Sequence, residues 1–333
     1  MRKPSVAVAV LSVVFIMLLV GCSRNVAQDI DAILESELLA SHGIVINRPD
    51  NPYFNFFEGE DRDALKVNVA LHVLGEHGEY FFTPGGWTDE RILQLVQVSE
   101  DGIRFAKNWL GSEIGTPIPF VFNITKPAPD SPLPMWGGGW ALRGAVYISM
   151  AARLMPSLIV HEAVHAILQI DGRRSNFPHT PETSSRRHSP FLEEGLCDLI
   201  DFLFFMETEH LYDVNRYGRD RQAAENHLHN AALRMFRFHD NFEDEAEFGL
   251  RYPQLMSYET AASFIYFLLQ RKGSVEDFMR VFEDIYLMEE VYGWGMDDMI
   301  AKWMEYLNEF RLRSQPSSAV MRFLRRAANI FDR

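Results

Sequence analysis

The chain has 333 residues, 47% of them apolar and 23% charged, which is the composition of a globular protein long enough to form a substantial core. Its net charge of -14 at pH 7 argues against nucleic acid as a partner and against a basic surface that would bind anionic lipid. The sequence contains neither internal repeats nor low-complexity segments.

The first 21 residues have the pattern of a secretory signal peptide. Arg2 and Lys3 precede an uncharged apolar run, residues 6–20, and Gly21 is the small residue before the expected cleavage point. The ending, residues 19–22, resembles the lipobox of bacterial lipoproteins, which implies that Cys22 carries lipid and becomes the mature N-terminus. A plain signal peptide or an uncleaved anchor with an incidental cysteine is the alternative, but the apolar run is short for a membrane span.

Lipidation at Cys22 would make the protein a lipid-anchored component of the bacterial cell envelope. Ser23, rather than an aspartate, follows the cysteine, and by analogy with other lipoproteins this favours the outer membrane. A single lipidated N-terminus tethers a domain to the bilayer without embedding it. Cys197, the second of two cysteines, then has no partner for an internal disulfide, and we expect a buried thiol that packs as a small apolar residue.

Both helices and strands are predicted before residue 153. Apolar positions along one side predict a helix over residues 26–41, whereas residues 43–86, rich in Gly, Pro and aromatic residues, predict only short strands and turns. A second helix is predicted from Thr88, a good N-cap, to Leu110, which Gly111 follows. The remaining predicted elements are strands over residues 117–124 and 144–149 and a proline-rich loop over residues 126–134. Beyond residue 153 the chain is expected to be almost wholly helical.

Residues 156–172 carry the motif H-E-x-x-H at His161, Glu162 and His165. In a helix the two histidines stand one turn apart on one face, so both can bind one metal ion. Glu162 lies about 100° round from His161, close enough to hold a water bound to that ion. A proline at the start and a glycine at the end of this segment suit the two ends of a helix. The residues between are almost all apolar, which predicts a buried helix.

A hydrolytic zinc ion takes three protein ligands and a water, so the motif needs a third ligand. The next predicted helix has Ser189 as its N-cap and Pro190 in its first turn, and it presents Glu194 and Asp198 on one face. One carboxylate can bind the metal, while the other accepts the free ring N–H of a ligand histidine. Glu193 is a rival ligand on the same helix.

These two motifs, H-E-A-V-H at residues 161–165 and F-L-E-E-G-L-C-D at residues 191–198, resemble the gluzincin metallopeptidases, the clan that contains thermolysin and the aminopeptidase N family. The resemblance implies that Glu194 is the third zinc ligand and that Asp198 orients a ligand histidine. Glu193 does not precede the glycine of the clan's Glu-Gly pair, which places it on another side of the helix.

The spacing of the two motifs departs from the clan. Glu194 follows His165 by 29 positions, which is a longer gap than usual. The excess is polar and contains glycine and prolines, so it indicates an insertion loop. Two histidines in this segment, His179 and His188, are expected to be ordinary loop residues.

Residues 257–273 add a candidate for binding the oxyanion. They predict a helix that ends at Gly273, and its start resembles the helix of the aminopeptidase N family whose tyrosine steadies the oxyanion. The resemblance implies that role for Tyr258. Thr260 and Ala261 replace the family's Lys-Gly, and a tyrosine on an ordinary amphipathic helix is the alternative.

The resemblance implies an α+β, thermolysin-like fold in one catalytic unit, without the large N-terminal β domain of the aminopeptidase N family. We expect a signal peptide over residues 1–21, a lobe with a small mixed sheet over residues 22–152, and a mostly helical lobe over residues 153–333 that carries the motif and the third ligand. The implied activity is hydrolysis of a peptide or protein substrate with one Zn²⁺ per chain. Glu162 would be the general base and Tyr258 a donor to the oxyanion.

Two other functions stay open at this point. In the first, the chain is an inactive lipoprotein that keeps the gluzincin fold for binding or envelope assembly. In the second, it is a general zinc-binding module. An intact Glu162 favours the enzyme, since binding alone does not require a general base.

Internal cleavage is favoured over aminopeptidase activity. The aminopeptidase N family binds the free amine of its substrate with a glutamate on the strand that edges the cleft, and the corresponding residues 135–143 contain no carboxylate. An ammonium buried without a countercharge is costly. We therefore expect an endopeptidase whose glycine-rich strand near Trp140 pairs with an extended substrate, unless Glu58 or Glu60 folds into the pocket.

Overall fold

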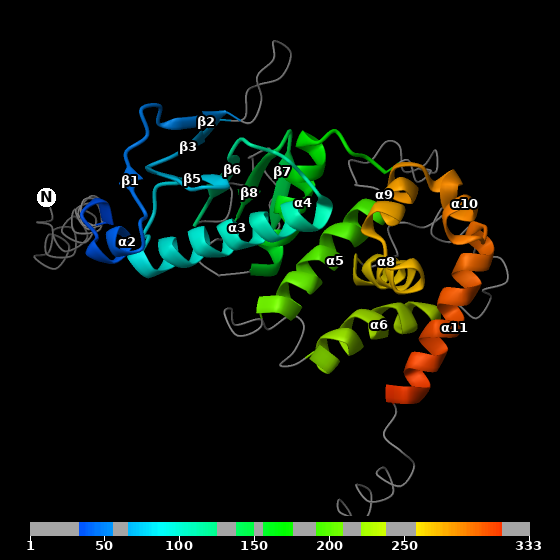
Figure 1. Ribbon diagram of the computed structural model, residues 1–333. Helices are drawn as coiled ribbons and strands as arrows, with labels where there is room; N and C mark the ends of the chain where they lie inside the picture. Colours follow the sequence, from blue (N-terminus) through cyan, green and yellow to red (C-terminus); the bar gives the residue numbers. More distant parts are fainter. Residues whose placement is uncertain are drawn as a thin grey trace, which may run out of the picture. The chain divides into compact units, whose positions relative to one another are not determined.

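The computed structural model describes residues 33–55, 66–124, 138–149, 156–175, 191–208, 221–237 and 258–314 (Figure 1). The chain divides into two compact units, residues 1–172 and 173–333, and each is described by itself. Several predicted features lie outside the described residues: the signal peptide, Cys22, Glu58, Glu60, the loop over residues 126–134, His179, His188, Ser189 and Pro190.

A six-stranded mixed sheet forms the first unit, with the strand order β1-β4-β5-β6-β8-β7. β5, β6 and β8 run parallel to one another, and antiparallel strands flank them on both sides. The strands are β1 (Ile46–Asn47), β4 (Leu71–Leu74), β5 (Gly78–Phe82), β6 (Ile118–Phe122), β7 (Gly139–Leu142) and β8 (Ala145–Ile148). β6 and β8 confirm the strands predicted over residues 117–124 and 144–149.

The two faces of the sheet are covered by different elements. On one face, aromatic side chains of neighbouring strands are fully buried beneath helices α3 (Asp89–Leu110) and α4 (Pro156–Ile170). These aromatic residues are Tyr80, Phe82, Phe120 and Phe122. On the other face, a ribbon of β2 (Tyr53–Asn55) and β3 (Lys66–Asn68) packs through Phe54 and Val67 against Tyr147.

α3 has the ends that the sequence predicts. Thr88 takes an extended backbone conformation and its side chain accepts a hydrogen bond from the Arg91 N–H, while Gly111 ends the helix in the left-handed region at φ 63°. α3 also packs closely on α4, because a Cβ atom added at Gly102 would lie 2.8 Å from Val160 Cγ2. This close crossing fixes the part of α4 that precedes the motif.

The helix predicted over residues 26–41 is interrupted within the described residues. Residues 33–34 are helical, but the chain turns at residues 35–36 and α2 covers only Glu37–Ser41. Ser36 accepts a hydrogen bond from the Leu39 N–H, so it caps a new helix instead of continuing an old one. Its hydroxyl also donates to Asp89 at the start of α3. A side chain that competes with the helix backbone therefore overrides the apolar periodicity.

The described part of the second unit contains helices and no strand, as expected for the chain beyond residue 153. The helices are α5 (Phe191–Thr208), α6 (Arg221–Arg237), α8 (Tyr258–Lys272), α9 (Val275–Glu283), η3 (Ile285–Leu287), α10 (Met288–Tyr292) and α11 (Met296–Ser314). α5 and α8 are in close contact, since a Cβ added at Gly195 would lie 2.5 Å from the Ala261 Cβ. The fold is therefore α+β, with a mixed sheet followed by helices.

The division between the units falls after Gly172, whereas we expected the helical lobe to begin at residue 153. α4 groups with the first unit because it packs on α3, β7 and β8. Among the described helices, none combines the length and the apolar character that a membrane span requires.

Candidate metal centre and active site

The H-E-x-x-H motif lies on α4, in the buried helix that the sequence predicts. Pro156 is its first residue, Ile170 is its last, and Gly172 follows with φ 69°. Every residue from Ile159 to Leu168 is buried, including both histidines and the glutamate of the motif. Polar groups at such depth need partners, and all three of these residues take part in interactions.

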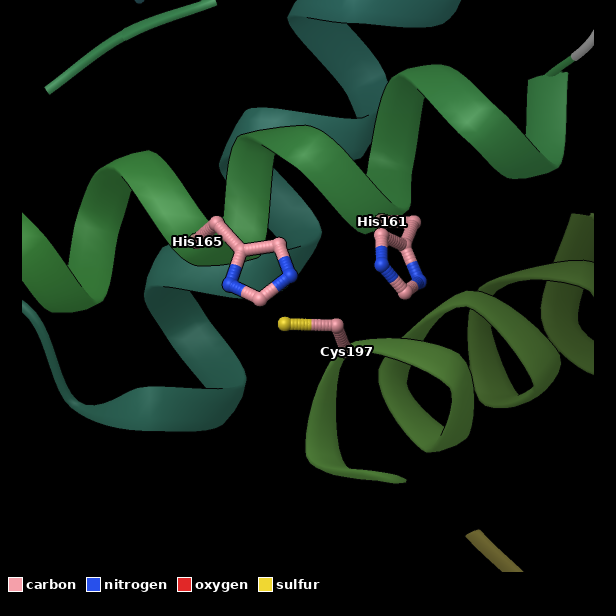
Figure 2. Close-up of side chains that lie close together, drawn as sticks. All are labelled: His161, His165 and Cys197. Carbon is pink, nitrogen blue, oxygen red and sulfur yellow. The ribbon is translucent and has the colours of Figure 1, made fainter. Parts of the chain in front are cut away.

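His161 and His165 project from the same side of α4, one turn apart (Figure 2). Each is 5% exposed, and their ring centroids are 5.0 Å apart with an angle of 68° between the ring planes. Each ring offers a nitrogen ligand atom within 4.8 Å of the other. Two ligand atoms about 2 Å from one zinc ion can be at most about 4 Å apart, and a separation of no more than 4.8 Å is close to that limit. The pair therefore fits a zinc site.

Glu162 lies directly against strand β7. A Cβ atom added at Gly139 would lie 2.3 Å from the Glu162 Cγ and 2.7 Å from its Oε1, so only a glycine allows this approach. Glu162 is 7% exposed. The glycine-rich stretch suggested a close backbone approach by a substrate, but the contact between Gly139 and the catalytic candidate was not predicted.

β7 is an edge strand of the sheet in the described structure. The Ser149 N–H donates to the Gly138 carbonyl over 3.0 Å, and the Gly138 N–H donates to Ser149 Oγ over 2.9 Å. Because backbone groups alternate in direction along an antiparallel pair, Gly138 and every second residue after it face β8. Gly139 and Ala141 therefore direct their N–H and C=O groups away from β8, towards the edge beside Glu162.

The other predicted site residues lie in the second unit. Glu194 is half-buried in the first turn of α5, and Asp198 is buried one turn later on the same face. Tyr258 is the first residue of α8, and its side chain is 49% exposed. The structure thus groups the H-E-x-x-H residues with β7 in one unit, and the two carboxylates on one helix of the other.

Two more residues of α5 have the chemistry of a site. Cys197, labelled in Figure 2, is fully buried as expected, and with the histidines of α4 it belongs to the residue types that bind zinc. Asp201 is buried seven positions after Glu194, which places it on the same face of the helix. Sequence reasoning did not consider Asp201, although its spacing from Glu194 and Asp198 was the available signal.

His229 of α6 is a buried histidine outside the motif. Its Nδ1 is 2.9 Å from Ser263 Oγ, and its Nε2 is 3.3 Å from the Tyr306 hydroxyl. Trp303 Nε1–H donates to the same serine oxygen over 3.3 Å, so Ser263 contacts both the histidine and α11. Burial lowers the pKa of His229 to about 4. This histidine is therefore neutral at pH 7 and is part of the core.

Comparison with known proteins gives no match: no family model, no curated protein and no solved structure is similar enough to be paired with this chain.

Proposed function

We propose that this chain is a zinc-dependent metallopeptidase with a gluzincin-type catalytic fold. The observation that carries the proposal is the pairing of α4 with β7. One buried helix presents two histidines on a shared face, and its glutamate lies against a glycine of an edge strand. In this proposal, one helix and one strand supply the metal ligands, the general base and a backbone edge for an extended peptide.

His161 and His165 would hold the zinc ion, with Glu194 of α5 as the third ligand and Asp198 as the acceptor for a ligand histidine's free N–H. When bound, zinc polarises the scissile carbonyl and makes the attacking water more acidic. Glu162 takes a proton from that water and delivers it to the leaving nitrogen. Tyr258 donates a hydrogen bond to the oxyanion that forms at the carbonyl.

The substrate is a peptide or an unfolded protein segment, bound as an added strand along β7. The outward N–H and C=O groups of Gly139 and the outward N–H of Ala141 are donors and acceptors that such a strand requires. No residue of β7 carries a carboxylate that would pair with a free amino terminus, which favours cleavage inside a chain. Digestion of the same peptide with a free and with a blocked N-terminus decides this point, since a strict need for the free amine would make the enzyme an aminopeptidase.

We further propose that lipid on Cys22 tethers the enzyme to the bacterial envelope, with the outer membrane favoured by Ser23. The support is the signal sequence and its lipobox-like end. Cys22→Ala should shift the protein from the membrane pellet to the soluble fraction of a cell extract. A mutant that stays in the pellet after an alkaline wash would indicate an uncleaved anchor.

The catalytic proposal is tested with Glu162→Gln. This nearly isosteric change removes the general base and keeps the helix and the histidine pair, so zinc content and thermal unfolding should match the wild type. Hydrolysis of an unbiased peptide library should fall by about 10²–10⁴-fold, which is the usual contribution of a general base. Unchanged turnover would exclude the mechanism. A wild-type protein that binds zinc and cleaves nothing would favour the alternative, an inactive gluzincin-fold lipoprotein used for binding or assembly.

A further inference from the structure

Gln169 on α4 holds the far end of strand β7. Its Nε2 donates to the Ala141 carbonyl over 3.2 Å, and its Oε1 accepts from the Gly144 N–H over 3.0 Å. The two partners define the orientation of the amide, because the flipped form would place oxygen against a carbonyl and nitrogen against an N–H. One side chain therefore satisfies two backbone groups of the β7–β8 hairpin.

Glu162 and Gln169 lie on the same side of α4. Seven residues correspond to nearly two full turns, and they separate the two side chains by about 10 Å along the helix axis. β7 advances by a similar length between Gly139, which touches Glu162, and the hairpin turn at residues 143–144. The strand thus runs along α4, with the general base at one end and the glutamine at the other.

The turn itself is held tightly against the last turn of α4. Arg143 and Gly144 have φ angles of 51° and 78°, as in a two-residue hairpin turn of type I′. A Cβ atom added at Gly144 would lie 2.5 Å from Ile170 Cγ1, so only glycine fits there. The position of Gln169 relative to the strand is therefore set by packing as well as by its two hydrogen bonds.

We propose that Gln169 is a positioning residue that ends the substrate-binding edge of β7 at Ala141. This inference rests on the proposed peptidase function and specifies how far the substrate is recognised. A peptide strand added to β7 forms its main-chain bonds opposite Gly139 and, two residues further along, opposite Ala141. Gln169 already donates to the Ala141 carbonyl, so its amide competes with the peptide N–H that would bind this oxygen.

The consequence is a limit on one side of the scissile bond. The peptide residue opposite Gly139 lies nearest to Glu162, where the bond is cleaved. On the side that leads towards the hairpin turn, main-chain recognition stops about two residues further on, whereas the glutamine places no limit on the other side. On the side of the cleaved bond that leads towards the hairpin turn, the enzyme therefore recognises only about two substrate residues through their main chain.

The test uses blocked peptides built on the best-cleaved sequence from the library digest and lengthened by one alanine at a time at either end. For the wild type, kcat/KM should stop rising after about two residues on one side only. In Gln169→Met, the Ala141 carbonyl becomes available, and long peptides should gain twofold to tenfold over short ones on that side through a lower KM, which is the effect of one hydrogen bond. Gln97→Met, the same change at an exposed position of α3, is the matched control.

The ratio of kcat/KM for long peptides to kcat/KM for short peptides distinguishes a positioning role from a general distortion of the site. A distorted site lowers kcat/KM for both peptides together and leaves the ratio unchanged. Gln169→Ala is the second variant if the methionine destabilises the fold. A length profile identical in wild type, Gln169→Met and Gln169→Ala would overturn the role of Gln169 and leave the peptidase intact. Failure of the wild type to cleave any peptide, or equal cleavage by Glu162→Gln, would instead overturn the proposed function and this inference with it.

Discussion

Buried histidines occur in both units of the protein, and they are held in different ways. His229 is enclosed by α8 and α11, with Ser263 on one ring nitrogen and Tyr306 on the other, and aromatic rings pack around it. His161 and His165 lie one turn apart on a single helix and offer nitrogen atoms to the same place. Side chains of two other helices contact both ring nitrogens in the first case, whereas the second arrangement places two potential ligand nitrogens on one face of a single helix.

This difference shows that burial of a histidine does not by itself indicate a site. His229 is more deeply buried than the α4 pair, and burial lowers its pKa, yet both of its ring nitrogens have partners within the core. Two features distinguish the α4 pair. The histidines have the spacing of one helical turn, and the Glu162 carboxylate beside them lies against the edge strand β7. The spacing of the two histidines and the closeness of the glutamate to an edge strand therefore indicate a site better than burial does.

The largest effect is expected from removing the proposed third ligand. Glu194→Ala should reduce bound zinc from about one equivalent to a small fraction, and it should lower hydrolysis by on the order of 100-fold or more, since even partners outside the ligand set are worth 10–100-fold. Metal analysis of the purified protein and library digestion measure the two effects. This result would confirm that the α4 pair, unlike His229, binds a metal and is completed from α5.

Three matched variants make that result specific. Glu193→Ala changes the neighbouring carboxylate of the same helix turn and should keep its zinc, as should His229→Gln in the core. Cys197→Ala tests the thiol of α5 as the rival ligand. If Glu194→Ala retains zinc and Cys197→Ala loses it, the third zinc ligand is the Cys197 thiolate, and the assignment of Glu194 is wrong.

How far the sequence predicts this molecule depends on the range of the interactions involved. α3 and α4 are predicted well because their caps, glycine ends and apolar spacing act within one or two helical turns. The break at Ser36 was missed because a short side-chain hydrogen bond competes with the periodicity.

The candidate site follows the same rule. His161, Glu162 and His165 are recognisable from spacing alone, since a helix brings them together whatever surrounds it. The contact between Glu162 and Gly139 and the bonds of Gln169 join segments more than twenty residues apart, and no local pattern encodes such a pairing. Glu194, Asp198 and Tyr258 remain predictions of the resemblance, because their role depends on the placement of one unit against another.

His229 should make the protein sensitive to acid in a way that does not depend on zinc. Its pKa is about 4 in the folded protein and 6.5 in an unfolded chain, so the unfolded state binds the additional proton between these values. The free energy of unfolding should therefore be unaffected by this group above pH 6.5 and should fall by up to about 3 kcal/mol as the pH drops to 4. Urea unfolding at several pH values, with and without a chelator, measures the slope.

Replacement of the ring identifies the source of that slope. In His229→Gln the acid-dependent loss between pH 6.5 and 4 should shrink, whereas Tyr306→Phe keeps the titrating ring and should keep the slope. If the slope is the same in His229→Gln as in the wild type, or if it disappears when zinc is removed, the acid sensitivity belongs to other groups. That outcome would remove the contrast drawn between the two sets of histidines.

The smallest effect is expected at Gly139, where the strand and the general base meet. Its φ angle is not in the left-handed region, so the backbone accepts alanine without strain. The added methyl group must displace the Glu162 side chain from its Cγ atom outwards. Gly139→Ala should therefore keep its zinc, because the histidine pair is untouched, while its thermal unfolding temperature falls slightly and hydrolysis falls by about tenfold, or roughly 1.4 kcal/mol of transition-state stabilisation. Gly115→Ala, where an added Cβ meets open space, is the control and should be silent in all three measurements. Full activity in Gly139→Ala would mean that Glu162 does not act from its place beside the strand, and the pairing of α4 with β7 would lose its catalytic meaning.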